Sequence, residues 1–235
     1  VRSSAKRRRF SLQRRRPGVS CTMLQKDSDD PSLSSTEFFD FESAEMQAFL
    51  DRVTPVDAAP LERLKAAYIA VRDGIAYNPY RIPLQREYYR ASRICRMKRA
   101  YCIPKSLLFA ACARALGFRS WIGLADVVNH LSSQRFIEYL GTNVFAYHGY
   151  AVVEVNGRRL KATPVFDAKL CAKFGVSPLD FDGENDALFQ QYDGRGQRFM
   201  EYIRERGEFD EFPFEEVMRG LAETYPHLIG NQVDG

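Results

Sequence analysis

Residues 101–111, Tyr-Cys-Ile-Pro-Lys-Ser-Leu-Leu-Phe-Ala-Ala, place a cysteine two positions before a proline and an apolar stretch. Proline is favoured in the first turn of a helix and glycine just after its end, so the pattern predicts a helix from Pro104 to Ala115, ended by Gly117. Its side chains are mostly apolar, which indicates a buried central helix. Free backbone N–H groups and the helix dipole favour negative charge at its start. We therefore expect a lowered pKa and a reactive thiolate at Cys102.

The dipeptide Asn156-Gly157 is the strongest hairpin signal in the chain, because it favours the tight turns that join antiparallel strands. A two-residue turn here places His148 opposite Val165, and Asp167 two residues further along on the same face. The two side chains are then diagonal neighbours, about 7–8 Å apart at Cα. The hairpin is expected to present an imidazole and a carboxylate together. Its other face is apolar and is expected to be buried: Ala151, Val153, Val155, Leu160, Ala162 and Phe166.

The remaining elements follow from hydrophobic spacing and from turn residues. Helices are expected over residues 44–53, 61–75, 86–98, 133–140, 170–175, 196–206 and 214–225. Strands are expected over residues 118–128, 148–155 and 158–167, and loops over residues 77–85 and 180–186. This mixture of helices and an antiparallel hairpin predicts an α+β fold.

Cysteine, histidine and aspartate together form a working nucleophilic set, in which histidine takes the thiol proton and aspartate fixes the histidine tautomer. Cys102, His148 and Asp167 are therefore the candidate catalytic residues, and the meeting of Cys102 with His148 is a hypothesis at this point. His130 is the competing base, and Asp182 is the competing carboxylate. The alternative for Cys102 is an inert buried thiol, since free cysteine is often buried. We expect that structural role for three further cysteines: Cys95, Cys112 and Cys171.

Three segments of the chain, taken in order, resemble the transglutaminase-like superfamily, which has a papain-like fold. They are Cys102-x-x-Lys105 followed by Arg114-Ala-Leu-Gly117, His148-Gly-Tyr-Ala-x-Val, and Lys161-Ala-Thr-Pro-x-Phe-Asp167. The resemblance covers roughly residues 60–190, and the chain looks like a small, stand-alone member of the bacterial type. It implies a cysteine at the head of a central helix. That helix packs on an antiparallel sheet that carries the histidine and the aspartate, with extra helices at the C-terminus.

Two features of the chain differ from the usual pattern of that superfamily. Tyr101 and Ile103 flank the cysteine, where members often have glycine before it and a small residue after it. The hairpin ends in Pro164-Val165-Phe166-Asp167, where Asp-Pro-Thr is commoner.

The resemblance implies thiol acyl transfer on amide or peptide bonds through a thioester. We expect hydrolysis, as in a protease or amidase, with a protein or peptide as substrate. The alternative is a non-catalytic module that binds proteins or peptides on the same fold, and the side chains that crowd the thiol favour it. Five aromatic residues could line a substrate cleft, although aromatic side chains are more often part of the core. They are Tyr77, Tyr80, Tyr88, Tyr89 and Trp121.

We expect no cofactor and no metal. The chain has no Cys-x-x-Cys pair, and its three histidines are not clustered, which argues against zinc. The acidic loop at residues 180–186 offers oxygen ligands but lacks the 12-residue EF-hand pattern that calcium would need.

Charge divides the chain into two parts. Residues 1–22 carry eight basic residues and no acidic one, which leaves 26 basic against 30 acidic side chains in the remainder. The mildly acidic remainder argues against nucleic acid as the main partner, unless the basic residues of 1–16 belong to the native protein. We expect residues 1–35 to form a disordered tail and residues 36–235 one domain. We favour a translation start at Met23, with a genuine basic arm as the alternative.

Cysteine usage and hydropathy bear on the compartment. Five cysteines in 235 residues do not suggest a disulfide framework, and no run approaches the roughly 20 apolar residues that span a bilayer. We therefore expect a cytoplasmic protein with no membrane partner. The sequence does not indicate an oligomeric state.

Overall fold

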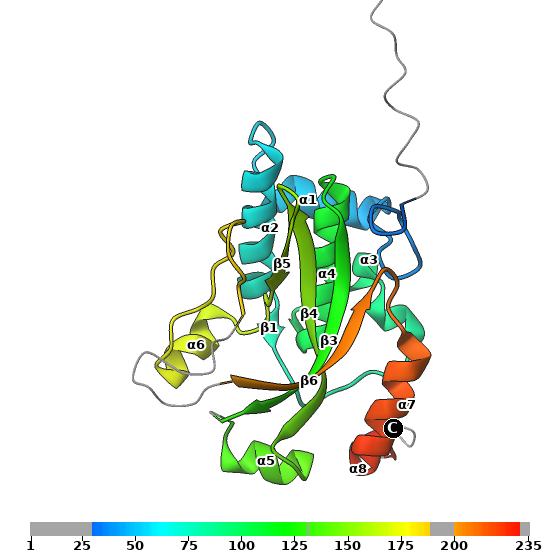
Figure 1. Cartoon of the computed structure of the whole chain (residues 1–235), viewed down its shortest axis with the longest axis vertical. Helices are drawn as coiled ribbons and strands as arrows, with labels where there is room; N and C mark the ends of the chain where they lie inside the picture. The colour runs from blue at the N-terminus through cyan, green and yellow to red at the C-terminus, as the bar shows by residue number, and fades with distance from the viewer. Residues whose placement is uncertain (1–29, 131, 189–199, 231–235) are drawn as a thin grey trace, which may run out of the picture.

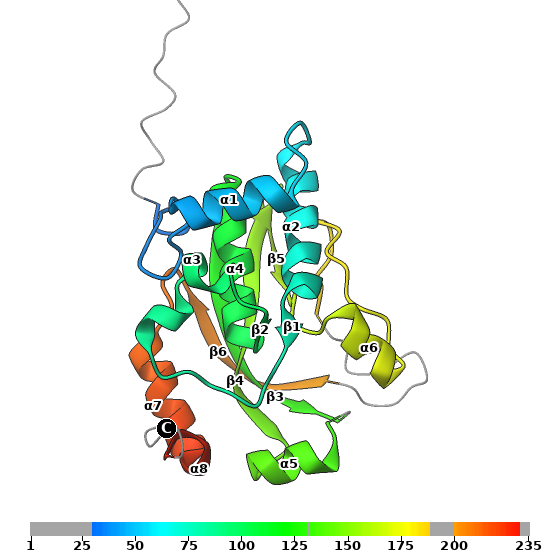
Figure 2. The ribbon, with the colours of Figure 1, turned by 180° about the vertical axis from the view of Figure 1, so that it is seen from behind.

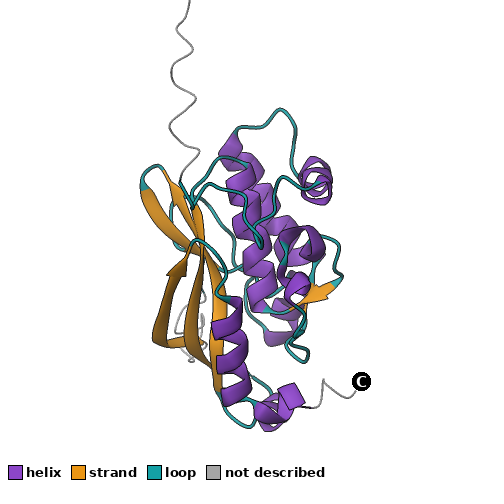
Figure 3. Cartoon of the chain, turned by 90° about the vertical axis from the view of Figure 1, so that its right-hand side faces the viewer, coloured by secondary structure: helices purple, strands orange, loops and turns teal. Residues whose placement is uncertain are grey.

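The computed structural model describes residues 30–130, 132–188 and 200–230. A four-stranded antiparallel sheet, in the order β5-β4-β3-β6, has a layer of helices on one face (Figure 1 and Figure 3). Its strands are β3 (Ser120–Asn129), β4 (Val144–Val155), β5 (Arg158–Ala162) and β6 (Met200–Phe209). Two short strands, β1 (Ala76–Tyr77) and β2 (Arg99–Ala100), pair in parallel within the helical layer (Figure 2). The predicted α+β class is confirmed.

The helices have the following bounds: α1 Ala44–Val53, α2 Pro60–Gly74, α3 Ala91–Ile94, α4 Cys102–Ala115, α5 Gln134–Leu140, α6 Ala168–Phe174, α7 Phe214–Thr224 and α8 Pro226–Gly230. A 3-10 turn, η1, covers Arg86–Tyr89. Helix α4 is the predicted central helix: every residue from Cys102 to Arg114 is buried. It lies against β4 and contacts α2 and α3, so the core forms on both sides of it.

The predicted hairpin register is confirmed. Val155 pairs with Arg158, and the ladder continues as far as Ala151 opposite Ala162. The apolar face that was expected to be buried is buried. The strand, however, ends at Ala162 and does not reach Asp167. The backbone N–H of Thr163 donates to the carbonyl of Ala187, and the following proline has no N–H to continue a ladder.

The expected helix over residues 196–206 is wrong where the structure describes it, because Met200–Phe209 forms β6. This strand pairs with β3, whose edge N–H and C=O groups would otherwise lack partners. The pairing shifts register twice, between Leu124 and Ala125 and between Asp126 and Val127. Each shift interrupts the alternation of inward and outward side chains, so the segment does not have the sequence pattern of a strand. Residues 196–199 lie outside the described residues.

The expected helix over residues 86–98 is also wrong as one continuous element. The chain is extended at Arg90, between η1 and α3. This break allows the backbone N–H of Ala91 to donate to the carbonyl of Phe38, and that of Ser92 to donate to Asp40 at 2.9 Å. Contacts with the N-terminal segment therefore outweigh the local helical preference.

The last residues of the expected N-terminal tail pack on the domain. The backbone N–H of Ser120 donates to the carbonyl of Ser32, and Arg119 pairs with Asp30 at 2.7 Å. The buried guanidinium of Arg114 donates to the carbonyl of Ser34 at 2.9 Å. Asp30–Ser34 thus contacts both β3 and the end of α4. In the described part of the chain, no helix is long and apolar enough to cross a membrane.

Candidate active site

Cys102 and His148 line one cavity of about 50 Å³ at the start of α4. Cys102 is the first residue of that helix and is 8% exposed, whereas His148 lies on β4 and is 4% exposed. The other walls come from β1 and its loop, α5, β4 and α7, and aromatic side chains dominate them. They include Tyr77, Tyr101, Phe136, Phe145, Tyr147 and Tyr225. The two residues that the sequence joined by hypothesis thus share one cavity.

Gly149 brings the two elements together. A Cβ atom at this position would lie 2.8 Å from the Cα of Ile103 and 3.2 Å from its backbone nitrogen. Only glycine therefore permits the backbone of β4 to approach the first turn of α4 this closely. The hydroxyl of Ser106 donates to the carbonyl of Gly149 at 3.0 Å and fixes the contact. His148 precedes this glycine, so the same contact sets its distance from the helix start.

Tyr147, on the other side of His148, has a left-handed backbone with φ of 56°. A bulge in the pairing of β3 with β4 places it opposite Asp126. The carboxylate of Asp126 accepts a hydrogen bond from the N–H of Tyr147 at 3.1 Å, and Arg206 binds that carboxylate through two nitrogens at 2.6 and 2.9 Å. The guanidinium also lies 3.8 Å from the centre of the Tyr147 ring. A buried ion pair therefore holds a strained residue beside His148.

Lys105 anchors the first turn of α4 from within the core. Its fully buried ammonium group donates to three carbonyls, those of Arg72 at 2.8 Å, Ile75 at 2.6 Å and Val165 at 2.7 Å. Burial lowers the pKa of Lys105 to about 7, and the nearby carboxylates of Asp167 and Asp73 act in the opposite direction. The three carbonyls match the three N–H donors of the charged form, so this lysine joins α4 to the end of α2 and to the segment after β5.

The expected lowering of the Cys102 pKa is wrong. Burial raises the pKa of this thiol to about 11, although the backbone N–H groups of Gly149, Ile103 and Cys102 itself act to lower it. Burial likewise lowers the pKa of His148 to about 4. The effect of desolvation on the thiol pKa is larger than the effect of the N–H groups at the helix start, because both Cys102 and His148 lie inside an apolar cavity. At neutral pH the two side chains are therefore a neutral thiol and a neutral imidazole.

This electrostatic state predicts the pH dependence of alkylation. The thiolate is the reactive form, and a pKa near 11 means that its fraction rises about tenfold for each pH unit up to that value. Labelling of folded Cys102 by iodoacetamide, followed by mass spectrometry, should therefore keep rising well above pH 8.5. The urea-unfolded protein is the control and should label with the ordinary thiol pKa of about 8.5. A folded-state midpoint at or below 8.5 would contradict the burial argument.

Asp167 lies at the N-terminus of α6 and makes no hydrogen bond with His148. One carboxylate oxygen accepts from the N–H of Leu170 at 3.0 Å, and the other accepts from the N–H of Tyr77 at 3.1 Å. Since the hairpin ladder stops at Ala162, the diagonal placement expected for Asp167 does not form. It caps a helix and fixes the position of β1 beside the cavity.

The competing candidates are placed elsewhere. The Nε2 atom of His130 contacts Glu201 at 3.3 Å. Asp182 accepts hydrogen bonds from the backbone N–H groups of Glu184 and Asn185. Neither His130 nor Asp182 is among the residues that line the cavity of Cys102. In the part of the chain that the structure describes, no three His, Cys, Asp or Glu side chains gather as metal ligands.

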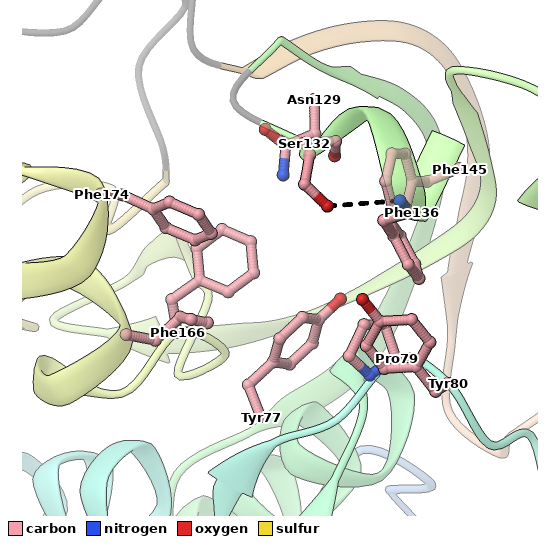
Figure 4. A pocket seen from close by; sticks show the side chains of 11 residues that line it. Tyr77, Pro79, Tyr80, Asn129, Ser132, Phe136, Phe145, Phe166 and Phe174 are labelled. Atoms are coloured by element: carbon pink, nitrogen blue, oxygen red, sulfur yellow. Dashed lines mark hydrogen bonds between the residues drawn. The ribbon is translucent and has the colours of Figure 1, made fainter. Parts of the chain in front are cut away.

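A larger aromatic pocket of about 170 Å³ adjoins the Cys102 cavity (Figure 4). The two share four lining residues: Tyr77, Pro79, Phe136 and Phe145. Phe166 and Phe174 form one side of the larger pocket, and Asn129 and Ser132 lie across from Tyr77. Of the five aromatic residues predicted to line a cleft, Tyr77 and Tyr80 do so in this pocket. The phenylalanines were not predicted, because pockets of this kind form between segments that are distant in sequence.

Comparison with known proteins agrees with this architecture. Residues 47–158 match the transglutaminase-like superfamily. The resemblance predicted from the sequence is therefore confirmed for that stretch, which contains both Cys102 and His148, whereas Asp167 lies beyond its end. None of the curated proteins matches the sequence. The superfamily includes cysteine-dependent enzymes, and the mixed α+β fold of this chain is consistent with it.

Proposed function

We propose that the chain is a cysteine-dependent acyl-transfer enzyme that acts on amide or peptide bonds, with Cys102 as nucleophile and His148 as general base. The observation that carries this proposal is the single cavity that both side chains line. The superfamily match over the same residues supports it. The left-handed backbone of Tyr147 supports it as well, because strain of this kind is concentrated at functional sites.

In the proposed reaction, Nδ1 of His148 takes the thiol proton while the sulfur of Cys102 bonds to the substrate carbonyl carbon. The π electrons of the carbonyl move to its oxygen. The N–H groups of Ile103 and Gly149, which act on the sulfur, are the candidate donors to this oxyanion. The adduct then expels the amine, which leaves with the proton held by His148, and a thioester remains.

Water completes the cycle in the hydrolytic reaction that we favour. His148 takes a proton from water as its oxygen attacks the thioester, and the departing sulfur takes that proton back, which gives a carboxylic acid and the free thiol. Water needs no second binding site, whereas cross-linking would need one for an amine. The adjoining pocket is lined mainly by aromatic side chains, which favours substrates with a large apolar side chain next to the reacting carbonyl.

The neutral state of the two residues suits general-base catalysis. A neutral imidazole can accept a proton, and the proton then moves during attack instead of before it. The apolar cavity would disfavour a permanent thiolate–imidazolium pair.

N-acetyl-phenylalanine p-nitrophenyl ester, an activated acyl donor with an apolar side chain, tests the proposal. We expect one acetyl-phenylalanyl group on Cys102, detected by intact mass and peptide mapping, with release of p-nitrophenol. Cys102→Ala should abolish the adduct, and His148→Ala should slow its formation by roughly 100-fold or more. Cys95→Ala is the matched control, because Cys95 is a thiol of similar exposure (7%) outside the cavity, and it should behave as the wild type. If the folded wild type shows neither a Cys102 adduct nor p-nitrophenol release that depends on Cys102, the nucleophile assignment is refuted.

The raised pKa of Cys102 and the lack of a carboxylate on His148 favour one other function, a non-catalytic peptide-binding module. The aromatic pocket would then be the binding site. In that case a peptide with an aromatic residue would bind wild type and Cys102→Ala equally, and no thioester would form with any acyl donor.

A further inference from the structure

Three buried polar atoms have no hydrogen-bond partner in this structure. They are Nε2 of His148, the hydroxyl oxygen of Thr163 and the hydroxyl oxygen of Tyr202. His148 and Thr163 are 4% and 1% exposed, so neither side chain can reach solvent for a partner. Unpartnered buried polar groups are rare and costly, and each calls for an explanation. None of the three makes a hydrogen bond with another in this structure, so a bond between any two of them needs a small movement of a side chain.

These three groups come from β4, from β6 and from the residue that follows β5. Tyr202 on β6 packs edge-on against His148, with ring centroids 6.1 Å apart. Burial raises the pKa of Tyr202 above its ordinary value, and the Thr163 hydroxyl beside it acts in the opposite direction. Thr163 directly follows Ala162, whose partner on β4 is Ala151.

We infer that the hydroxyls of Thr163 and Tyr202 orient His148 from its Nε2 side, in the position that a carboxylate would occupy in a Cys–His–Asp set. This inference rests on the proposed function. With Nδ1 free to accept the thiol proton, Nε2 carries the ring proton and needs an acceptor. One hydroxyl oxygen can accept a hydrogen bond from the Nε2–H group and donate its own hydrogen to the oxygen of the second hydroxyl. Thr163 and Tyr202 are therefore positioning residues.

A hydroxyl pair differs from a carboxylate in one decisive way, because it fixes the ring tautomer without adding negative charge. The imidazolium form of His148 then gains no ionic partner, and Cys102 gains no stable cation beside it. Among the described residues that line its cavity or pack on its ring, the titratable side chains are tyrosines and the thiol itself: Tyr77, Tyr101, Cys102, Tyr147, Tyr202 and Tyr225. The carboxylate of Asp126, which is paired with Arg206, accepts a hydrogen bond from the backbone N–H of Tyr147. The side chains of Cys102 and His148 therefore stay uncharged in the absence of substrate.

Four variants test this inference. Thr163→Val keeps the shape and removes the hydroxyl, so acyl transfer should slow by roughly 10- to 100-fold, while Thr163→Ser should restore it. Tyr202→Phe should have a smaller effect in the same direction. Thr163→Asp places a carboxylate beside Nε2 and should raise the pKa of His148 above its ordinary value of about 6.5. Iodoacetamide labelling of Cys102 at pH 7 should then increase roughly tenfold or more.

Long-range ¹H–¹⁵N spectra report the tautomer and the pKa of His148. The His148→Ala variant identifies the His148 signals among those of the three histidines. The inference fails if Thr163→Val and Thr163→Ser behave alike. It also fails if folded Thr163→Asp leaves the His148 pKa and the Cys102 labelling profile unchanged. The His148 spectra and the iodoacetamide labelling of Cys102 need no substrate, so they remain informative if the wild type forms no acyl-enzyme. The absence of any acyl-enzyme would overturn the proposed function but not this inference.

Discussion

Lys105→Met should destabilise the protein by about 3–5 kcal/mol, because removal of one partner from a buried charged network leaves the others unsatisfied. Methionine fills similar volume but donates no hydrogen bond. The carbonyls of Arg72, Ile75 and Val165 would each lose their bond to the ammonium group. All three are held inside the core, so each would bear a desolvation cost. The end of α2 and the segment after β5 would lose their link to α4.

Urea unfolding followed by circular dichroism measures this effect. The midpoint should fall with little change in slope, since the same surface is exposed on unfolding. Lys65→Met is the matched control, because Lys65 is a half-buried lysine on α2 whose partner is the exposed Glu62 at 3.0 Å. That variant should change stability by less than about 1 kcal/mol. Equal midpoints for the two variants would show that the buried ammonium has no special role.

Gly149→Ala should impair both folding and chemistry. The new methyl group would lie 2.8 Å from the Cα of Ile103, and a backbone atom cannot turn aside as a side chain can. Strand β4 and the start of α4 must therefore move apart, at a cost of about 1–3 kcal/mol. The same movement would separate His148 from Cys102. A displacement of about 1 Å in a catalytic pair can lower the rate about 100-fold, and we expect a loss of that order in acylation of Cys102.

Gly74→Ala provides the control for this substitution. Gly74 is at the end of α2, its added Cβ would meet no atom within 4 Å, and its backbone is not left-handed. Its stability should change by less than about 1 kcal/mol, with wild-type acylation. The two variants are compared by thermal unfolding and by the rate of p-nitrophenol release. If Gly149→Ala acylates as fast as Gly74→Ala, the close approach of the two elements does not set the catalytic geometry.

Local sequence signals were sufficient for several elements of the fold. Asn156-Gly157 determined the hairpin register, and Pro104 with Gly117 bounded the central helix to within two residues. Strand β6 could not be predicted, because it exists by pairing with β3 and its bulges break the alternation of side chains. The break at Arg90 has a similar cause, since its hydrogen bonds go to Phe38 and Asp40, more than 50 residues away.

The site could be predicted only in part, because some of its features are local in the sequence and others depend on the fold. Cys102 and His148 were found because one begins a helix and the other belongs to a hairpin with a readable register. Asp167 was paired with His148 by extending that register beyond Ala162, but Thr163 turns its N–H toward Ala187 and the ladder ends. The pKa of Cys102 was misjudged because the helix start is a local feature, whereas burial depends on the walls of the whole cavity.

The contacts of Asp30–Ser34 have a practical consequence for recombinant versions of this protein. A chain that begins at residue 36, as the composition alone would recommend, would lack the Ser34 carbonyl that Arg114 uses and the Ser32 carbonyl that receives the N–H of Ser120. Arg114 would keep two carbonyl acceptors, those of Ser120 and Asp210. The shortened protein would begin β3 with an unsatisfied amide and hold the far end of the Cys102 helix less firmly. Expression designs should therefore retain the chain from Asp30 onward.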